Sequence, residues 1–397
     1  MSRRCEYGKV FKNLYCFQGF KIDGINLDGL LVISLGRTGL RPRCPVCGKS
    51  CRAESVYLRR VRDFDIAGKS CYLEFPEYKV KCRCGHRGME KLGFVRPYSH
   101  CTRRYEEFVA LLCDHMSIKE VSEITGLPWR TVKDADMRCI RDWVLQVKRE
   151  DPVFLGVDEV AYEKGHHYLT IVRDVQRGIV IWAGEGRKET TLDLFFQSLG
   201  EAVRKIRAVV MDMWDPYIAS TSRWTRADIV FDKFHVAKKV NETLDKIRRR
   251  EFANAAPSER REFKKKRFII LKRRKNLDET GIEKLSALMD RNKMLYKAYL
   301  LKEQLMDILD TISKEEATHR LSLWEKNVRR SKIPEYQELV KTLEYYMFGI
   351  HAYFDYGLTN AASEGFNNKI NLIKRRAYGF HDIEYFKLKI LKLCGRS

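Results

Sequence analysis

The chain has 397 residues, which is too long for one ordinary domain and predicts two to four. Lysine and arginine outnumber the acidic residues by 76 to 53, which gives a net charge of +23. This charge predicts a polyanionic partner, most simply nucleic acid; the alternative is a generally basic protein that has no such partner. No apolar run reaches the roughly 18 residues of a membrane span, and the N-terminus has no apolar signal core, so we expect a cytoplasmic protein.

The cysteines predict a metal site near the N-terminus, because eleven of the twelve precede residue 140. They include a C-x-x-C pair and a C-x-C pair, each followed by glycine: Cys44, Cys47, Cys82 and Cys84. Four thiolates in two close pairs suit one tetrahedral zinc ion, which predicts a zinc ribbon over residues 1–100. His86 could replace one thiolate, Cys51 and Cys71 are expected to pack, and four unligated cysteines are the alternative.

Residues 101–150 predict a helix-turn-helix segment. Ser117 and Glu120 have the spacing of a capping box, and the turn at 125–127 contains glycine. Pro128 is expected at the first position of the next helix, with Trp129 facing inward. The outward residues of that recognition helix are expected to contact DNA, and they are Arg130, Thr131 and Lys133. An ordinary helical hairpin is the alternative.

From residue 151 the pattern predicts a mixed β-sheet. The expected strands are 152–160, 167–173, 178–183, 208–214 and 227–234, with a helix at 190–203 between the third and fourth strands. The order β-β-β-α-β-α-β-α is that of a ribonuclease-H-like catalytic domain, which we expect to comprise residues 151–237 and 347–397. The whole chain is thus predicted to be a multidomain α/β protein.

Three of these strands are expected to end on an aspartate: Asp158, Asp212 and Asp232. The first and fourth strands are neighbours in this order, so Asp158 and Asp212 should meet at one sheet edge. Two carboxylates that close repel each other unless a cation neutralises them, which predicts Mg²⁺ or Mn²⁺ there.

Residues 238–346 predict a basic α-helical insertion. Three basic clusters, at 248–250, 264–267 and 272–275, lie within about thirty residues. A solvated charged face is the default interpretation of such runs. Their density favours a surface for the DNA backbone.

A last polar helix is predicted from residue 359 onward. Ala362, Phe366, Ile370 and Ile373 share one face, and the opposite face carries Asn360, Glu364, Asn367, Asn371 and Arg375. Asparagines around a single glutamate are unusual on a solvated surface. They suit a carboxylate ligand flanked by groups that contact a nucleic-acid backbone, so Glu364 is the expected third acid.

Together these stretches resemble insertion-sequence transposases of the ISL-three type. The matching stretches are 80–86, 156–160, 211–217 (Met-Asp-Met-Trp-Asp-Pro-Tyr), 231–236 (Phe-Asp-Lys-Phe-His-Val), 359–369 and 374–380. The resemblance implies a DDE triad at Asp158, Asp212 and Glu364. It also implies two catalytic Mg²⁺ or Mn²⁺ ions, one structural Zn²⁺, and two-metal cleavage and transfer of DNA strands.

The implied partners are double-stranded DNA, as terminal inverted repeats and as target, and further copies of the chain. The active complex would be a homodimer or higher oligomer, associated with the nucleoid of a prokaryote. Further DNA contacts are expected from the last helix, at Asn367, Asn371, Lys374, Arg375 and Arg376. Two alternatives remain: a catalytically inactive DNA-binding protein derived from a transposase, and a nuclease that only hydrolyses. A ligand role for Asp215 or Asp232 is left open.

Overall fold

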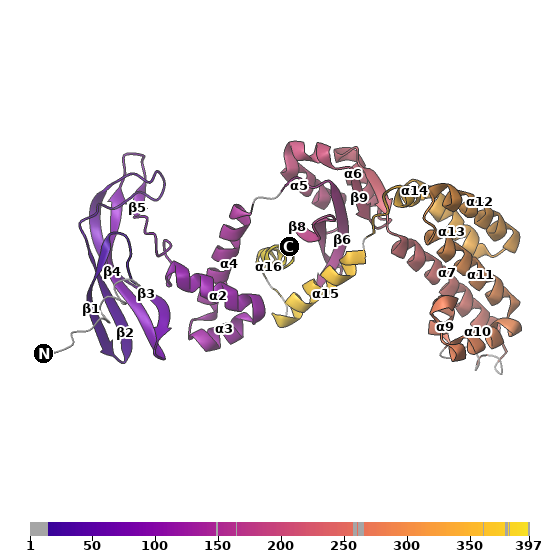
Figure 1. The fold of residues 1–397 in the computed structure, drawn as a ribbon, viewed down its shortest axis with the longest axis horizontal. Helices are drawn as coiled ribbons and strands as arrows, with labels where there is room; N and C mark the ends of the chain where they lie inside the picture. The colour runs from indigo at the N-terminus through magenta and orange to yellow at the C-terminus, as the bar shows by residue number, and fades with distance from the viewer. Residues whose placement is uncertain are drawn as a thin grey trace. The chain divides into compact units, whose positions relative to one another are not determined.

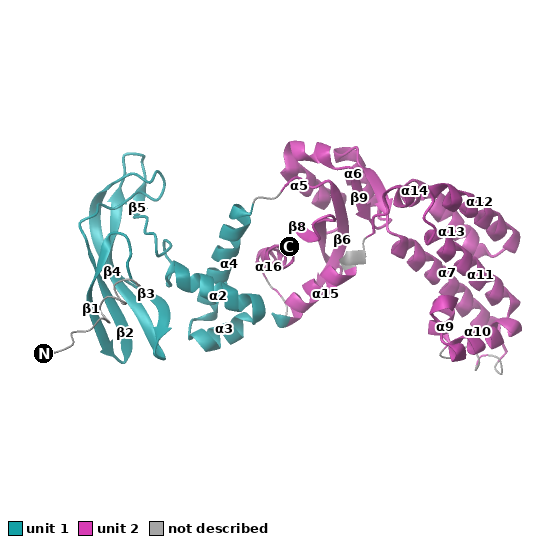
Figure 2. Cartoon of the chain, in the orientation of Figure 1, with its two compact units in different colours: residues 1–148, 376–378 teal, residues 149–375, 379–397 magenta. Residues whose placement is uncertain are grey.

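The computed structural model describes residues 15–147, 150–163, 165–256, 260, 266–359, 361–377, 380 and 382–395. The chain forms two compact units (Figure 2), residues 1–148 with 376–378 and residues 149–375 with 379–397. Within the described ranges, no helix is long and apolar enough to cross a membrane.

The first unit contains a five-stranded sheet built on two hairpins. Its strands are β1 (Phe20–Asp28), β2 (Leu30–Arg37), β3 (Arg52–Ile66), β4 (Lys69–Lys81) and β5 (Arg87–Met89). The order is β1-β2-β4-β3, with β5 added to β4. Alternate residues of β4, such as Cys71, Leu73 and Phe75, are buried against β2, as the period of two requires. The sequence pattern predicts strands over 56–61 and 71–75, which lie within β3 and β4, and it missed β1 and β2.

Three helices follow in the same unit: α2 (Arg103–His115), α3 (Ile118–Thr125) and α4 (Trp129–Gln146). The capping box of Ser117 and Glu120 is confirmed, and Gly126 ends α3 with a φ of 68°, a conformation that favours glycine. Two details of the prediction were wrong. Pro128 is the N-cap of α4 instead of its first residue, and Trp129 is 62% exposed, because the buried face of α4 begins only at Val132.

Buried ion pairs join this sheet to these helices. The carboxylate of Asp63 on β3 accepts hydrogen bonds from Thr102 Oγ1 (2.7 Å) and Arg104 Nε (2.9 Å) at the start of α2. Glu106 on α2 is buried and pairs with Arg96 and with Arg138 of α4. Because a buried carboxylate is costly without partners, these contacts fix the helices against the sheet. The cysteine-bearing sheet and the helix-turn-helix therefore belong to one compact unit.

The second unit is built on a five-stranded mixed sheet, and its element order confirms the ribonuclease-H-like prediction (Figure 1). The elements are β6 (Phe154–Glu163), β7 (His167–Asp174), β8 (Ile179–Glu185), α5 (Glu189–Leu199), η1 (Gly200–Lys205), β9 (Ala208–Met211), α6 (Asp215–Trp224), β10 (Asp228–Phe231) and α7 (Lys233–Asn254). The strand order is β10-β9-β6-β7-β8, so the first and fourth strands are neighbours as expected. Asp158, however, does not end β6, because pairing with β7 continues to Glu163.

Helices cover both faces of this sheet. On one face lie α15 (Ala361–Arg376) and α16 (Ile383–Cys394), whose Ile370, Ile373, Phe386 and Ile390 are buried against Val160 and other residues of β6, β7 and β8. Phe195 and Phe196 of α5 pack on the opposite face, where Leu155 and Val157 lie. Asp158 alternates with Val157 along the strand, so its side chain is on the α15 face.

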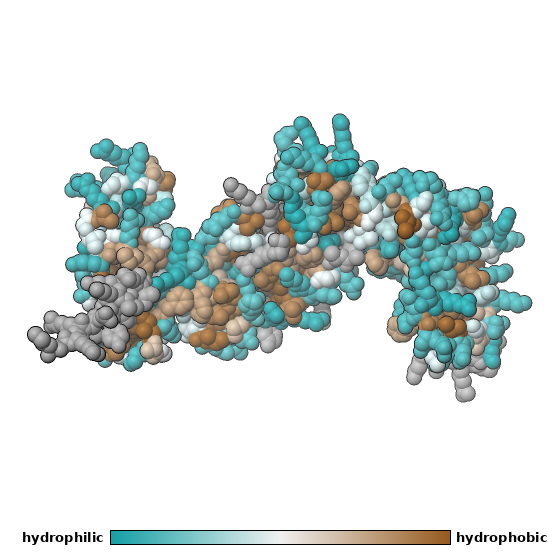
Figure 3. Space-filling view, in the orientation of Figure 1, coloured by the Kyte–Doolittle hydropathy of each residue, from teal (hydrophilic) through white to brown (hydrophobic). Residues whose placement is uncertain are grey.

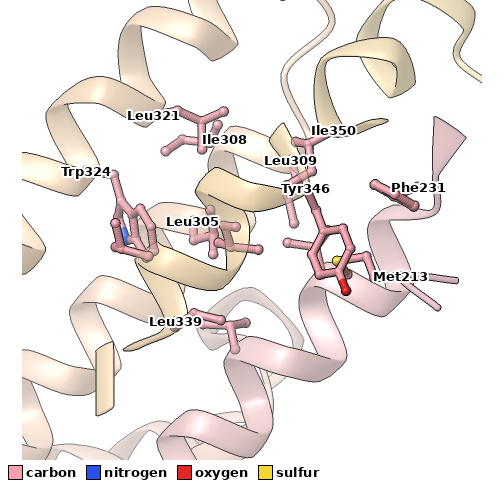
Figure 4. Packing of buried hydrophobic residues seen from close by; sticks show 14 of the residues in the cluster. Met213, Phe231, Leu305, Ile308, Leu309, Leu321, Trp324, Leu339, Tyr346 and Ile350 are labelled. Atoms are coloured by element: carbon pink, nitrogen blue, oxygen red, sulfur yellow. The ribbon is translucent and has the colours of Figure 1, made fainter. Parts of the chain in front are cut away.

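The predicted insertion is helical. Its described elements after α7 are α9 (Arg267–Leu271), η2 (Arg274–Asn276), α10 (Glu279–Arg291), α11 (Lys293–Leu309), α12 (Lys314–Ser331) and α13 (Pro334–Tyr345), and α14 (Met347–Tyr356) follows directly. Their apolar core is continuous with that of the sheet (Figure 4). Phe231 of β10, for example, meets Tyr346 edge-on with ring centroids 5.4 Å apart. The insertion is thus a structural part of the unit.

Several basic residues of the insertion have internal partners. Arg250 Nη1 lies 2.6 Å from Glu335 of α13, Arg248 bonds Asp245, and Arg273 pairs with Asp307 and Asp310. Some residues of the basic clusters therefore hold the helices of the insertion together through ion pairs. The surface over these helices is mostly hydrophilic in Figure 3. Lys264 and Lys265 of the second cluster lie outside the described residues.

Gly349 allows α14 to approach β10 closely, and its replacement should destabilise the fold. A Cβ atom at this position would lie 2.3 Å from the ring of Phe231. Gly349→Ala should therefore lower the free energy of unfolding by about 1–3 kcal/mol, the usual cost of overpacking, less the helix propensity gained. The matched control is Gly365→Ala in α15, where nothing lies within 4 Å and alanine should be neutral or stabilising. Urea unfolding of both variants compares them, and equal stability would contradict the packing argument.

Candidate active site

The sheet brings three aspartates to one edge. β6 pairs in parallel with β9 up to Gly156 and Val210, and β10 pairs in parallel with β9 up to Phe231 and Met211. Continued along each chain, this register places Asp158 level with Asp212, and Asp212 level with Asp232. The carboxyl ends of parallel strands are where α/β sheets commonly bind ligands.

Asp158 is held from two sides. Its Oδ2 accepts a hydrogen bond from Asn367 Nδ2 of α15 at 2.9 Å, and its Oδ1 accepts one from the backbone amide of Glu159 at 2.7 Å. The bond to Asn367 joins positions 209 residues apart in the chain and fixes the middle of α15 over the strand. Asp158 is half-buried, so one part of the carboxylate remains accessible.

Asp212 is paired with His235 of the first turn of α7, through Oδ1 and Nε2. Burial alone would lower the pKa of His235, but the hydrogen bond to Asp212 and the charges of Asp212, Asp232 and Asp158 together raise the pKa above its ordinary value. Apart from this contact, the buried Oδ1 of Asp212 has no hydrogen-bond partner among the described residues. It is an oxygen that a bound cation could use.

Asp232 is nearly fully buried and caps α7 by accepting the backbone amide of Phe234 at 2.9 Å. Arg173 of β7 is also buried, under the ring of Phe366 of α15. Burial lowers the pKa of Arg173, and the charges of Asp158 and Asp232 act to raise it. A buried guanidinium therefore offsets part of the negative charge of the three aspartates.

Glu364 lies on α15, one turn before Asn367, with its side chain exposed. Among the described residues, only the four predicted cysteines form a group of three or more candidate metal ligands within 4.8 Å of one another. Asp158, Asp212 and Glu364 do not form such a group. Asn360, expected on the same polar face, lies outside the described residues.

The four cysteines lie close enough together to hold one metal ion, because their sulfurs are all within 4.8 Å of one another. The sulfurs of Cys44 and Cys84 are 3.6 Å apart, and those of Cys47 and Cys82 are 3.5 Å apart. Zinc–sulfur bonds of about 2.3 Å in a tetrahedron require sulfurs about 3.8 Å apart. Burial raises the pKa of the Cys44 thiol, but backbone amides, including that of Val46, outweigh this and lower the pKa to about 6. His86, the alternative ligand, is not part of this group.

Three family models match successive parts of the chain. The zinc finger of the transposases of IS204, IS1001, IS1096 and IS1165 matches residues 40–85, and the helix-turn-helix domain of transposase family ISL3 matches residues 90–140. The ISL3 DDE transposase model matches residues 155–390, more than half of the chain. The chain belongs to the ISL3 family of DDE transposases.

Full-length relatives agree with this assignment. The transposase for insertion sequence element IS1001 from Bordetella parapertussis is 32% identical over 394 residues, which is 96% of this chain and 97% of the relative. The transposase for IS1557 from Mycobacterium tuberculosis is 31% identical over 404 residues, 93% of this chain and 90% of the relative. The Drosophila P element transposase strand transfer complex aligns with a TM-score of 0.39 and 12% identity over 74% of this chain and 92% of that one, which is too distant to inform the fold.

The side chains of the transposase that are expected to contact DNA differ in their exposure to solvent. Arg130 is exposed on α4, and Thr131 and Lys133 are half-buried. Arg375 and Arg376 are exposed near the end of α15, whereas Asn371 is half-buried. Lys374 is half-buried and donates to the backbone oxygen of Ala161 at 3.1 Å.

Sequence reasoning missed three residues of the transposase's acidic edge. His235 and Arg173 were not singled out, and the hydrogen bond of Asn367 to Asp158 was not anticipated. His235 could have been found, because it follows Asp232 by three residues and directly follows the predicted strand 227–234. Nothing in the sequence indicated the partners of Arg173 or Asn367.

Proposed function

We propose that this transposase binds the terminal inverted repeats of its own insertion sequence and catalyses metal-dependent cleavage and transfer of DNA strands. The observation that carries the proposal is the parallel pairing of β6 with β9, which brings Asp158 and Asp212 to one edge of the sheet. The family match supports a phosphoryl-transfer role for that edge.

Asp158, Asp212 and Glu364 are the proposed ligands of two Mg²⁺ or Mn²⁺ ions. Carboxylate oxygens suit these hard cations, and the otherwise unbonded Oδ1 of Asp212 is available to one. When bound, such ions lower the pKa of an attacking water or position a 3′-hydroxyl, and they stabilise the leaving oxygen. The carboxylates act as ligands, so no covalent intermediate with the protein is required.

The other residues of the edge position these acids. Asn367 orients the carboxylate of Asp158, and His235 orients that of Asp212. The positive charge of the buried Arg173 reduces the mutual repulsion of Asp158 and Asp232. Glu364 precedes Asn367 by one turn of α15, so both residues lie on the same side of that helix.

The remaining parts of the chain are proposed to recognise DNA. One zinc ion would hold the two cysteine pairs together. Arg130, Thr131 and Lys133 would read bases, while Asn367, Asn371, Lys374, Arg375 and Arg376 would contact the DNA backbone. Bringing two ends of an element together needs a homodimer or higher oligomer in the active complex.

One assay tests the proposed function. Purified protein is incubated with Mg²⁺ and DNA that carries the inverted repeats flanking its gene, and binding, cleavage and joining are scored separately. The proposal predicts all three activities. Binding without cleavage would indicate an inactive DNA-binding protein, and cleavage without joining would indicate a nuclease.

Arg130→Ala tests the recognition helix. If Arg130 reads a base edge, the substitution should weaken binding to the element's ends by roughly 1–3 kcal/mol and leave binding to unrelated DNA nearly unchanged. Titrations on both DNAs measure the difference. Lys119→Ala is the control, because Lys119 is an exposed cation on α3, outside the predicted recognition helix. An equal loss on both DNAs for Arg130→Ala would mean that it contacts phosphate only.

A further inference from the structure

A basic cavity lies beside the cysteine cluster of the first unit. Its volume is about 1130 Å³, and Cys47, Cys82 and Cys84 form part of its wall. Six cationic side chains line it, from Arg37, Arg41, Lys49, Arg52, Lys81 and Arg83, and its lining contains no aspartate or glutamate. An acid-free concentration of cations predicts an anionic ligand.

Five of these six cations are not used by the fold. Arg37 is the exception, because it has structural contacts. It donates a hydrogen bond to the backbone oxygen of Pro76, pairs with Glu90 and lies over the rings of Phe20 and Tyr78. The other five make no ion pair or side-chain hydrogen bond with any described residue, and all five are exposed. Elsewhere in the same sheet the pattern differs, since Arg59, Arg60 and Arg87 each have an acidic partner.

The strand register adds a second, independent observation. Arg52 and Lys81 are directly opposite each other in the antiparallel pair of β3 and β4, whereas Arg87 of β5, also opposite Lys81, is paired with Glu54. Like charges opposite each other on neighbouring strands destabilise a sheet. A bound anion would remove this repulsion. Anion binding would therefore explain why like charges are opposite each other here, which folding alone does not.

The shape and lining of the cavity indicate the class of anion. The cations come from three separate segments, near residues 41, 49–52 and 81–83, and five of them are exposed, which suits contact with several phosphates of a polymer. Single-stranded nucleic acid is usually held by exposed aromatic rings, but the one aromatic residue in the lining, Tyr78, is covered by Arg37. The backbone of duplex DNA fits these features best.

We propose that Arg41, Lys49, Arg52, Lys81 and Arg83 form a docking site for the phosphate backbone of duplex DNA, separate from the recognition helix α4. This inference rests on the proposed binding of the element's ends. Cys82 and Cys84 alternate with Lys81 and Arg83 along the chain, so a metal held by these thiols would also fix this part of the docking site. The site adds affinity that is independent of base sequence.

The test compares two triple variants of the full-length protein that remove the same amount of charge. R52Q/K81Q/R83Q alters the docking site, and K21Q/R60Q/K69Q removes three cations of the same sheet that do not line the cavity. Dissociation constants are measured without Mg²⁺ over a range of salt concentrations, on an element end and on an unrelated duplex. Zinc content and circular dichroism confirm that both variants fold.

The docking-site variant should show a weaker salt dependence on both DNAs. The slope of log K against log salt should fall by roughly 0.9 for each phosphate that is no longer neutralised, hence by up to about 3, and the control variant should keep the wild-type slope. Equal slopes for the two triples would overturn the proposal, as would weaker binding to the element end alone. If the triple variant does not fold, R83Q alone should still lower the slope by about 0.9. Because Mg²⁺ is absent, failure of the catalytic proposal would not affect this result.

Discussion

Asp158→Asn, Asp212→Asn and Glu364→Gln are each expected to lower DNA cleavage and joining by on the order of a thousandfold or more, because the charge that holds the metal ions is removed while the size of the side chain is kept. Binding to the element's ends should persist, since the cysteine cluster and the recognition helix are unchanged. Gel-shift titrations and cleavage rates on the same DNA measure the two effects separately.

Glu159→Gln and Asp215→Asn are the matched controls, and both should cost much less. Glu159 adjoins Asp158 but alternates to the other face of β6, where it lies 3.3 Å from Arg187. Asp215 accepts a hydrogen bond from Tyr346 of the helical insertion at 2.8 Å, which gives it a structural role. If Asp212→Asn cuts at nearly the wild-type rate while Asp215→Asn or Asp232→Asn is inactive, the second acid is a different one. Normal cleavage by every variant would contradict the proposed metal site altogether.

The second large effect concerns the cysteine cluster. The purified protein should contain about one zinc ion per chain, and Cys47→Ser or Cys82→Ser should lose it. Structural zinc contributes about 10–16 kcal/mol in small zinc-finger peptides, so the loops around residues 44–47 and 82–84 should lose their fold. Elemental analysis and thermal unfolding measure the change, and DNA binding should weaken with it.

Cys16→Ser controls for the removal of a thiol as such. Cys16 is exposed in the same unit and is not part of the four-cysteine group, so zinc content and stability should not change. A Cys82→Ser protein that is as stable as Cys16→Ser, or a wild-type protein that folds without metal, would contradict the zinc site.

The order of the catalytic sheet could be predicted because its strands are apolar, turns join the first three, and helical patterns separate the last two. The end of the first strand could not. The apolar run stops at Val157, but backbone pairing with β7 extends the strand to Glu163, and pairing depends on a partner that composition does not reveal. β1 was missed for a related reason, since this edge strand leaves Ile25 and Leu27 exposed and lacks a clean alternation.

The placement of Asp158 and Asp212 at one sheet edge could be predicted, but the side chains that contact them could not. Asp158 and Asp212 stand out as charges beside buried strands, a local feature. The bond from Asn367 to Asp158 depends on how α15 lies on the sheet, and the pair of His235 and Asp212 depends on the angle of α7. Such geometry is set by the packing of whole elements and is not encoded in any short stretch.

The helices α15 and α16 cover the face of the sheet on which Asp158 lies, and they come last along the chain. Synthesis proceeds from the N-terminus, and domains generally fold as they emerge. The DNA-binding unit therefore leaves the ribosome well before α15 and α16 are available to cover the sheet. A product that stops before residue 361 would carry the recognition helix but would lack Glu364 and would expose Leu169, Ile171 and Val180 to solvent. Exposed apolar surface promotes aggregation and proteolysis, so incomplete chains should be removed before they can compete with the full-length protein for the ends of the element.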